Sequence, residues 1–412
     1  MSLARRARLL LVALSTAALL PLTLPNSASA ATPGPVTSSP APAEQDHVLA
    51  VPDEPDEDFV EECEKDEEAN SEQGRVWNRR LWCQHTTSTG EFYLDGRPVG
   101  GAEITFTAVA HADPQERRVR VFFRVDDFET YGIVNSFSDM RIRVGCQAGC
   151  TVTNRDDEED TWENHWLLTW RDLMGWASWD IESDPALGVG TDKLSRHFWQ
   201  FTGQLSSAYG NTTVPGVGRQ HWIRCDSATY FRGAPRACIN DDVVPFLTYS
   251  KSDVSRPADG YVGTAGVARH IEAAQNTPSQ TYPNYGSPKT IPGKFTGVWT
   301  DPGLHRVPYK GSVWSANQLE KNRVRDHVAP YNGPDDLPPK PDAPVDADEY
   351  PFATTQEGAG QRDGTGAITG NFSVQWVDSQ ENRKAGRQLR DFYRTERILY
   401  GNQDEFYVRI VP

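Results

Sequence analysis

The sequence predicts two folded domains, an all-β, sandwich-like domain followed by an α+β domain with a small sheet and flanking helices. Apolar and polar residues alternate over much of 63–220, which is the period of a β-strand. After Cys225 the pattern changes to helix-length amphipathic segments between short strand-like ones. A chain of 412 residues also exceeds the usual size of one domain. We therefore expect the domains to span 59–220 and 221–412.

The first 30 residues are typical of an export signal. Three arginines precede an apolar run, and a small-x-small triplet follows: Arg5, Arg6, Arg8, Leu9–Leu20 and Ala28–Ala30. The apolar run is too short to span a bilayer. We therefore expect cleavage near Ala30, a secreted mature chain, and no membrane association after cleavage.

Residues 31–58 are rich in Pro, Ala, Ser and acidic residues, which predicts a disordered stalk. The net charge of −16 is concentrated near this stalk. Between Glu44 and Glu72 there are 14 carboxylates and one Lys, whereas from Tyr261 onward 17 Lys and Arg face 18 Asp and Glu. The acidity of the whole chain therefore does not exclude a nucleic-acid partner for its C-terminal part.

Individual strands in the first domain can be recognised by their alternation. Glu103–Ala110 alternates cleanly, and Arg118–Val125 and Met140–Val144 do so nearly as well. Turn residues separate these segments, so we expect a β-sandwich. The Trp-rich stretch Trp162–Trp179 is expected to pack its core or cover one edge.

The second domain mixes helices and strands. We expect helices at Ala265–Gln275 and Ala316–Val328, the latter introduced by a capping box of Ser315 and Gln318. Further along we expect a strand entry at 346–353, a strand at Phe372–Val377, a helix from about Arg383 to Leu399, and a final strand at Glu405–Val411.

Six cysteines in an exported chain predict disulfides. Sequence order favours the local pairs Cys63–Cys83, Cys146–Cys150 and Cys225–Cys238, although six cysteines allow 15 connectivities. A zinc site is the alternative. It is the weaker one, because the close Cys146/Cys150 pair lacks a second pair or a His couple at ligand spacing.

Three short motifs gather acidic and amide groups in the C-terminal part. They are DADEYPFA (Asp346–Ala353), QEGAG (Gln356–Gly360) and ENRKAG (Glu381–Gly386). Carboxylates beside a Gly-rich turn and an Asn suit a hard metal ion acting on phosphate. Each motif also has a structural interpretation: a strand entry with solvated acids, an ordinary turn, and a helix capped by Glu381 or Asn382.

The last predicted helix carries a stripe of arginines. Spacings of 4, 3, 4 and 3 put five of them on one face: Arg383, Arg387, Arg390, Arg394 and Arg397. Guanidinium groups in such a row can follow phosphates. The alternative is a solvated face partly paired with Asp391 and Glu396.

Other residue types give weaker functional signals. His270, His305 and His327 are more typical of structural histidines than of catalytic ones. The signatures of zinc proteases, serine hydrolases and nucleotide-binding loops do not occur in the sequence.

The three motifs, in this order, resemble the catalytic part of the NucA/NucB deoxyribonucleases, a family of secreted bacterial nucleases. The resemblance covers roughly 225–412. The matching segments are Asp348–Ala353, Glu357–Ala359 and Asn382–Gly386, and upstream His270–Ala274 and Leu304–Arg306 are similar to a helix and a short basic segment of the family. In this chain Ala347 and Thr355 stand where relatives often carry Cys, so a local disulfide of the family is missing.

The resemblance implies metal-dependent hydrolysis of DNA phosphodiesters. Asp348 and Glu357 would serve at a divalent metal, with Mg²⁺ or Mn²⁺ suited to hard oxygen ligands. Glu349 and Asn382 would complete the catalytic group. Four residues of the arginine stripe would bind DNA without base recognition: Arg383, Arg387, Arg390 and Arg394.

A different class of function remains open from the sequence. The chain could be a non-catalytic exported binding protein, whose β-sandwich recognises a polysaccharide or a surface partner while the C-terminal domain is degenerate. A nuclease acting as an antibacterial toxin is a third possibility. It would require an inhibitor or immunity protein, which the sequence does not identify.

Overall fold

The computed structural model describes residues 36–37, 51–147, 149–214, 219–284, 288–297, 300–333 and 336–412. The predicted signal peptide, 1–30, and most of the predicted stalk, 31–58, lie outside the described residues. The end of the stalk segment is described, and there Val51 is buried and helix α1 (Glu57–Glu64) begins at Glu57. Asp56 caps this helix, because its carboxylate accepts the N–H of Phe59 at 3.0 Å.

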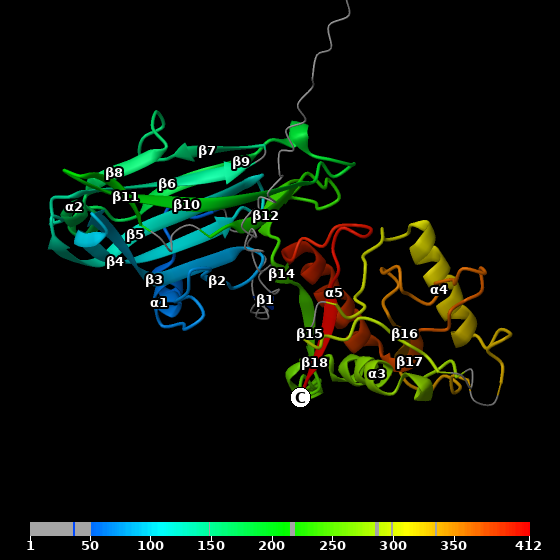
Figure 1. Cartoon of the computed structure of the whole chain (residues 1–412). Helices are drawn as coiled ribbons and strands as arrows, with labels where there is room; N and C mark the ends of the chain where they lie inside the picture. The colour runs from blue at the N-terminus through cyan, green and yellow to red at the C-terminus, as the bar shows by residue number, and fades with distance from the viewer. Residues whose placement is uncertain are drawn as a thin grey trace, which may run out of the picture. The chain divides into compact units, whose positions relative to one another are not determined.

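Two six-stranded antiparallel sheets form the β-rich region (Figure 1). The first runs β2 (Arg75–Val76), β3 (Leu81–Leu94), β4 (Arg97–Ala112), β5 (Arg118–Gly132), β9 (Ala177–Ser183) and β7 (Cys150–Asn154). The second runs β13 (Ala237–Asn240), β12 (His221–Asp226), β10 (Ser195–Ser207), β6 (Asp139–Gln147) and β8 (Trp162–Trp166), with β11 (Gly210–Val214) paired to β10. Short elements complete the region: α2 (Leu167–Asp172), the 3₁₀ turn η1 (Pro185–Leu187), and β1 (Val36–Thr37) parallel to β14 (Val243–Val244).

One apolar core lies between the two sheets. Trp82 on β3 contacts Trp199 on β10 edge to face, with ring centroids 5.4 Å apart, and Phe106 and Phe123 stack at 5.1 Å. Alternate residues of each strand point into this core, as a period of two requires. The predicted β-rich character of the N-terminal part is therefore confirmed. Two tryptophans of the Trp-rich stretch, Trp170 and Trp179, are fully buried in the core.

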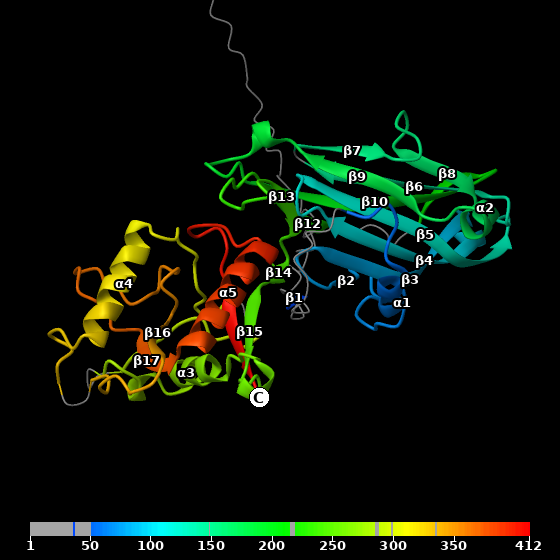
Figure 2. The same cartoon turned by 180° about the vertical axis from the view of Figure 1, so that it is seen from behind.

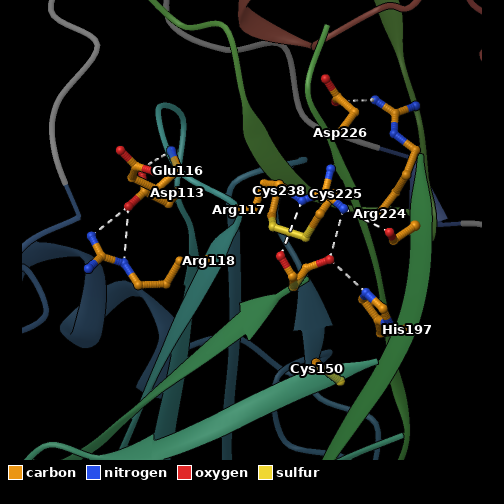
Figure 3. The surroundings of a disulfide bond; sticks show 12 residues. Asp113, Glu116, Arg117, Arg118, Cys150, His197, Arg224, Cys225, Asp226 and Cys238 are labelled. Atoms are coloured by element: carbon orange, nitrogen blue, oxygen red, sulfur yellow. Dashed lines mark hydrogen bonds and ion pairs between the residues drawn. A yellow bond between two sulfur atoms is a disulfide. The ribbon is translucent and has the colours of Figure 1, made fainter. Parts of the chain in front are cut away.

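The three disulfides join the cysteine pairs that sequence order favours. Cys225 and Cys238 lie directly opposite each other on β12 and β13 (Figure 3). The bond fixes β13 to the edge of the second sheet, and Arg224 and Asp226 lie on either side of Cys225. With all six cysteines paired, no thiolate remains for the alternative zinc site.

The C-terminal region combines helices with small sheets, as expected. Its helices are α3 (Ala265–Asn276), α4 (Ser312–Arg325) and α5 (Ser379–Thr395), with short 3₁₀ turns η2 (Pro257–Asp259) and η3 (Pro278–Gln280). Strand β15 (Phe246–Ser250) runs parallel to β18 (Tyr407–Val411), and β16 (Val345–Tyr350) is antiparallel to β17 (Ser373–Asp378). Among the described residues, no helix has the length and apolar character needed to cross a membrane.

Two helix starts differ from the sequence prediction. Helix α4 begins after Gly311, so Ser315 lies inside the helix and the predicted capping box is wrong. Helix α5 begins after Asp378, whose Oδ1 accepts the N–H groups of Gln380 at 2.9 Å and Glu381 at 3.1 Å. Glu381 and Asn382 therefore lie in the first turn and do not cap α5, because an Asp further upstream already does so.

The β16–β17 hairpin separates two packing environments. Ala347 lies opposite Trp376 on one face, and Asp348 lies opposite Gln375 on the other. The face of Asp348 also carries Tyr350, which packs in the core formed with α3 and α5. The face of Ala347 packs against residues of α4 and the segment that follows it. Neighbouring acids on β16 consequently point into different surroundings.

Candidate active site

Asp348 is held by a buried histidine of α3. Nδ1 of His270 lies 2.7 Å from Asp348 Oδ2, and Nε2 lies 2.9 Å from the Ser373 hydroxyl. His270 is fully buried, because the amphipathic helix α3 turns this face toward the hairpin. With both ring nitrogens engaged, the imidazole fixes the orientation of the carboxylate. Sequence reasoning placed His270 on a helix but did not identify Asp348 as its partner.

Glu357 is held in the same way by His305. Its Oε2 accepts the backbone N–H of His305 at 2.9 Å, and its Oε1 lies 2.8 Å from the His305 Nδ1. The hydrogen bond to Glu357 raises the pKa of His305 above its ordinary value, against the opposing effect of burial. The carboxylate thus favours the protonated form of this imidazole.

The turn that carries Glu357 is built around a buried amide. Asn317 of α4 is fully buried and donates through Nδ2 to the carbonyl oxygens of Ala353 at 2.9 Å and Thr355 at 2.8 Å. Its Oδ1 accepts the N–H of Gly360 at 2.9 Å. A Cβ on Gly358 would lie 2.4 Å from Asn317 Nδ2, so this position requires glycine for close approach. No sequence signal pointed to Asn317.

Glu349 occupies the opposite face of β16 from Asp348. Its Oε1 accepts a 2.7 Å hydrogen bond from Gln318 Nε2, and its Oε2 lies 3.5 Å from the Lys321 ammonium. Only 11% of its side chain is exposed. Burial raises the pKa of Glu349 to about 7, although Lys321 acts in the opposite direction. This carboxyl group can therefore exchange a proton near neutral pH.

Glu357 acts electrostatically on Tyr350 of β16. Burial raises the pKa of Tyr350, and the negative charge of Glu357 adds to that rise. Tyr350 and Asp348 are two residues apart on β16 and share a face. Asp348 thus shares its face of the hairpin with a residue that senses the charge of Glu357, and Glu349 points to the other face.

The first turn of α5 lies beside β16 (Figure 2). Asn382 is half-buried, and Arg383 lies 3.7 Å from Asp346. Three arginines of the predicted stripe are exposed and the fourth is half-buried: Arg383, Arg387 and Arg390, then Arg394.

Arg397 does not belong to this stripe. Helix α5 ends at Thr395, so the 4-and-3 spacing no longer describes a common face at position 397. Arg397 is buried and donates from Nη2 to Asp226 at 2.7 Å. Its predicted neighbour Glu396 is also buried, and so does not pair with the exposed stripe.

A cleft of about 760 Å³ follows β16. Its lining comes from α4, β16, β17, the start of α5 and the segment between α4 and β16: Lys321, Arg325, Asp326, His327, Pro339, Lys340, Val345, Asp346, Ala347, Trp376 and Asn382. Lys321 lines the cleft and contacts Glu349, and Asn382 in the first turn of α5 also lines it. The cleft therefore adjoins the acidic motif of β16.

The donor atoms at Asp348 and Glu357 fit a hard cation that needs few protein ligands. Within the described ranges, three His, Cys, Asp or Glu ligand atoms come within 4.8 Å of one another only at Glu64, His85 and Asp126. That group is in the β-rich region, and Arg124 donates to Glu64 at 2.7 Å and to Asp126 at 2.8 Å, so a guanidinium already neutralises it. Mg²⁺ commonly takes one or two carboxylates together with water and substrate phosphate. Asp348 and Glu357 lie outside that three-ligand group, so a cation held there would depend on water and substrate phosphate for its other ligands.

Comparison with known proteins identifies the C-terminal part. Residues 313–409 match the family model described as deoxyribonuclease NucA/NucB. Neither a curated protein nor a solved structure matches the chain. The matched residues include Asp348, Glu349, Glu357 and Asn382, whereas His270 and His305 precede them. The C-terminal region of this chain therefore carries a domain of the NucA/NucB deoxyribonuclease family.

Proposed function

We propose that this chain is a secreted, metal-dependent deoxyribonuclease that hydrolyses DNA phosphodiester bonds with little sequence preference. The family match supports the reaction class. The observation that carries the proposal is that Asp348 and Glu357, from two separate motifs, each have a histidine partner, at 2.7 Å and 2.8 Å. Such pairs orient carboxylates for a ligand more firmly than solvated acids can be oriented.

Asp348 and Glu357 are the residues that would hold Mg²⁺ or Mn²⁺. The cation supplies positive charge that offsets the charge developing on the phosphate during hydrolysis. His270 and His305 keep the two carboxylates from rotating. Because these histidines come from α3 and from the segment before α4, the complete site needs residues upstream of the matched stretch.

Glu349 is proposed to take part in proton transfer, acting from the other face of β16 than the proposed metal carboxylate Asp348. Its Oε2 is buried, lies 3.5 Å from the Lys321 ammonium and has no hydrogen bond, so taking a proton requires water to enter beside Lys321. A pKa of about 7 matches a general base that works near neutral pH. Asn382 is proposed to orient the scissile phosphate through its amide.

The exposed arginines of α5 are proposed to contact the DNA backbone. Guanidinium groups bind phosphate oxygens in a bidentate way, and such contacts carry no base information. Export is supported by three disulfides, which form in oxidising compartments. We expect the mature protein to begin after Ala30.

Plasmid cleavage by the purified mature chain tests the proposal. Mg²⁺ or Mn²⁺ should support cleavage and a chelator should abolish it. Glu349→Gln should reduce the cleavage rate by about 10²–10⁴, the usual contribution of a general base. Glu357→Gln should raise the concentration of Mg²⁺ or Mn²⁺ that cleavage requires, because it weakens binding of the cation. Glu103→Gln, at an exposed position of β4, is the matched control. Intact plasmid under every condition would instead favour the non-catalytic binding protein.

A further inference from the structure

The cleft beside β16 contains an aromatic side chain that the proposed chemistry does not use. Trp376 on β17 lies opposite Ala347 and lines the cleft with it. Its indole N–H donates to the carbonyl oxygen of Pro338 at 2.8 Å. The hydrogen bond fixes the ring in place, so an aromatic surface is preformed at the wall of the cleft.

The same wall carries more cations than anions. Lys321, Arg325 and Lys340 contribute three positive charges, and Asp326 and Asp346 contribute two negative ones. Lys340 is exposed, and Arg325 keeps a 2.7 Å ion pair with Asp326. In a chain with a net charge of −16, this lining favours a ligand that offers both negative charge and an aromatic face.

The cleft lies at the start of β16, where Val345, Asp346 and Ala347 line it. Within the described residues, β16 pairs with β17 alone, so its other edge is open. Lys321 approaches from α4 and contacts Glu349, and Asn382 approaches from the start of α5. A chain lying in the cleft would thus pass beside Asp346 and near Glu349, whereas Asp348 points to the other face of the hairpin.

We propose that this cleft binds an unpaired strand of DNA, with one base stacked on Trp376 and the adjoining phosphates contacted by Arg325 and Lys340. The inference rests on the proposed nuclease function, and it specifies the form of the substrate. Bases in a duplex stack on each other, so an aromatic side chain reaches a base only when it is unpaired or has been unstacked. A volume of about 760 Å³ is that of a small-ligand pocket, which accommodates single nucleotides rather than a helix.

The inference can be tested in the active protein by comparing cleavage of single-stranded DNA with cleavage of duplex DNA. Trp376→Ala should lower kcat/KM for a single-stranded oligonucleotide about tenfold relative to kcat/KM for the blunt duplex of the same sequence, since the substitution removes base stacking. The change should appear mainly in KM. Trp376→Phe should restore most of the single-strand preference. Trp222→Ala, at a tryptophan 41% exposed in the β-rich region, is the control.

A binding assay separates this inference from the proposed function. Fluorescence anisotropy with a labelled single-stranded oligonucleotide, in chelator, should give an about tenfold weaker Kd for Trp376→Ala than for the wild type. If the wild type cleaves no DNA but shows this difference, the proposed function fails and the cleft assignment stands. If Trp376→Ala has the affinity of the wild type, or weakens duplex and single-strand binding equally, the cleft assignment is overturned. Unchanged thermal unfolding of the variants confirms that folding is not the cause.

Discussion

Arg79 of the β-rich region donates a 2.9 Å hydrogen bond from Nη1 to Oδ1 of Asp404 in the C-terminal region, and both side chains are buried. Arg224 donates to the same oxygen, and the other oxygen of Asp404 accepts the N–H of Leu399 at 2.8 Å. Burial alone would raise the pKa of Asp404, but the two guanidinium groups outweigh it and lower the pKa to about 2. Residues of the β-rich region thus hold the segment between α5 and β18.

Asp404→Asn should destabilise the protein strongly. The substitution removes the negative charge between two buried guanidinium groups, and breaking a buried pair costs on the order of 3–5 kcal/mol. Urea unfolding at neutral pH measures the change in the free energy of unfolding. Asp391→Asn, at a half-exposed acid of α5 that lies 3.3 Å from Arg390, should change it by less than about 1 kcal/mol. Equal effects of the two substitutions would contradict the role given to Asp404.

The same segment is linked to the candidate active site. Nη1 of Arg306 donates to the carbonyl oxygen of Ile398 at 2.8 Å, and Arg306 directly follows His305, the partner of Glu357. Gln356, beside Glu357, donates to Asn402 at 2.8 Å. A disturbance at Asp404 should therefore reach the turn that carries Glu357 through Arg306 and Gln356, without any contact with DNA.

Acid should destabilise the protein through His221. Burial lowers the pKa of His221 to about 3, so the folded protein keeps this imidazole neutral. The unfolded chain binds a proton near pH 6.5, so the stabilising contribution is fully present above that pH and is lost as pH falls toward 3. Between these two pKa values the free energy of unfolding falls by about 1.4 kcal/mol for each unit of decrease in pH, for this one group.

His221→Gln should remove the contribution of His221 to the pH dependence of the free energy of unfolding between about pH 6 and pH 4, even if it lowers the overall stability. Unfolding in urea at several pH values measures it. His327→Gln is the control, because His327 is exposed. An unchanged slope in the His221 variant would show that other groups cause the acid sensitivity.

The strand pattern of the β-rich region could be predicted because burial on one face of a sheet leaves a period of two in the sequence. Helix α3 was predicted within one residue at its C-terminal end, since its apolar face is continuous. The start of α4 was predicted wrongly. Gly311 precedes the helix and no side chain caps it, so no capping signal in the sequence marks this start.

The partners of the acidic residues could not be predicted in the same way. His270 and Asp348 are 78 residues apart, and His305 and Glu357 are 52 apart, so neither pair leaves a local pattern. Arg397 continued the arginine spacing in sequence, but its ion pair with Asp226, 171 residues away, holds it in the interior. Three-dimensional contacts of this kind override helix periodicity at the end of a helix.

Gly358→Ala should damage the turn of Glu357 while leaving the rest of the fold intact. The added Cβ would lie 2.4 Å from Asn317 Nδ2, which holds this turn through three hydrogen bonds. We expect a loss of about 1–3 kcal/mol in the free energy of unfolding and a larger proportional loss of nuclease activity. Gly364→Ala is the control, since a Cβ there meets nothing within 4 Å. Wild-type activity in Gly358→Ala would contradict a need for close packing at this turn.

The exposed arginines of α5 should determine how strongly salt weakens DNA binding. Each phosphate contact contributes about 0.9 to the slope of log K against log salt concentration for duplex DNA and about 0.7 for a single strand. The double substitution Arg387→Ala and Arg390→Ala should therefore reduce the magnitude of the slope by nearly 2 for duplex, with similar losses across sequences. Anisotropy titrations over a range of salt concentrations measure it. Arg236→Ala, at an exposed arginine paired with Glu116 in the β-rich region, should leave the slope unchanged. A slope unaffected by the double substitution would mean that this face of α5 is only solvated and does not contact the DNA backbone.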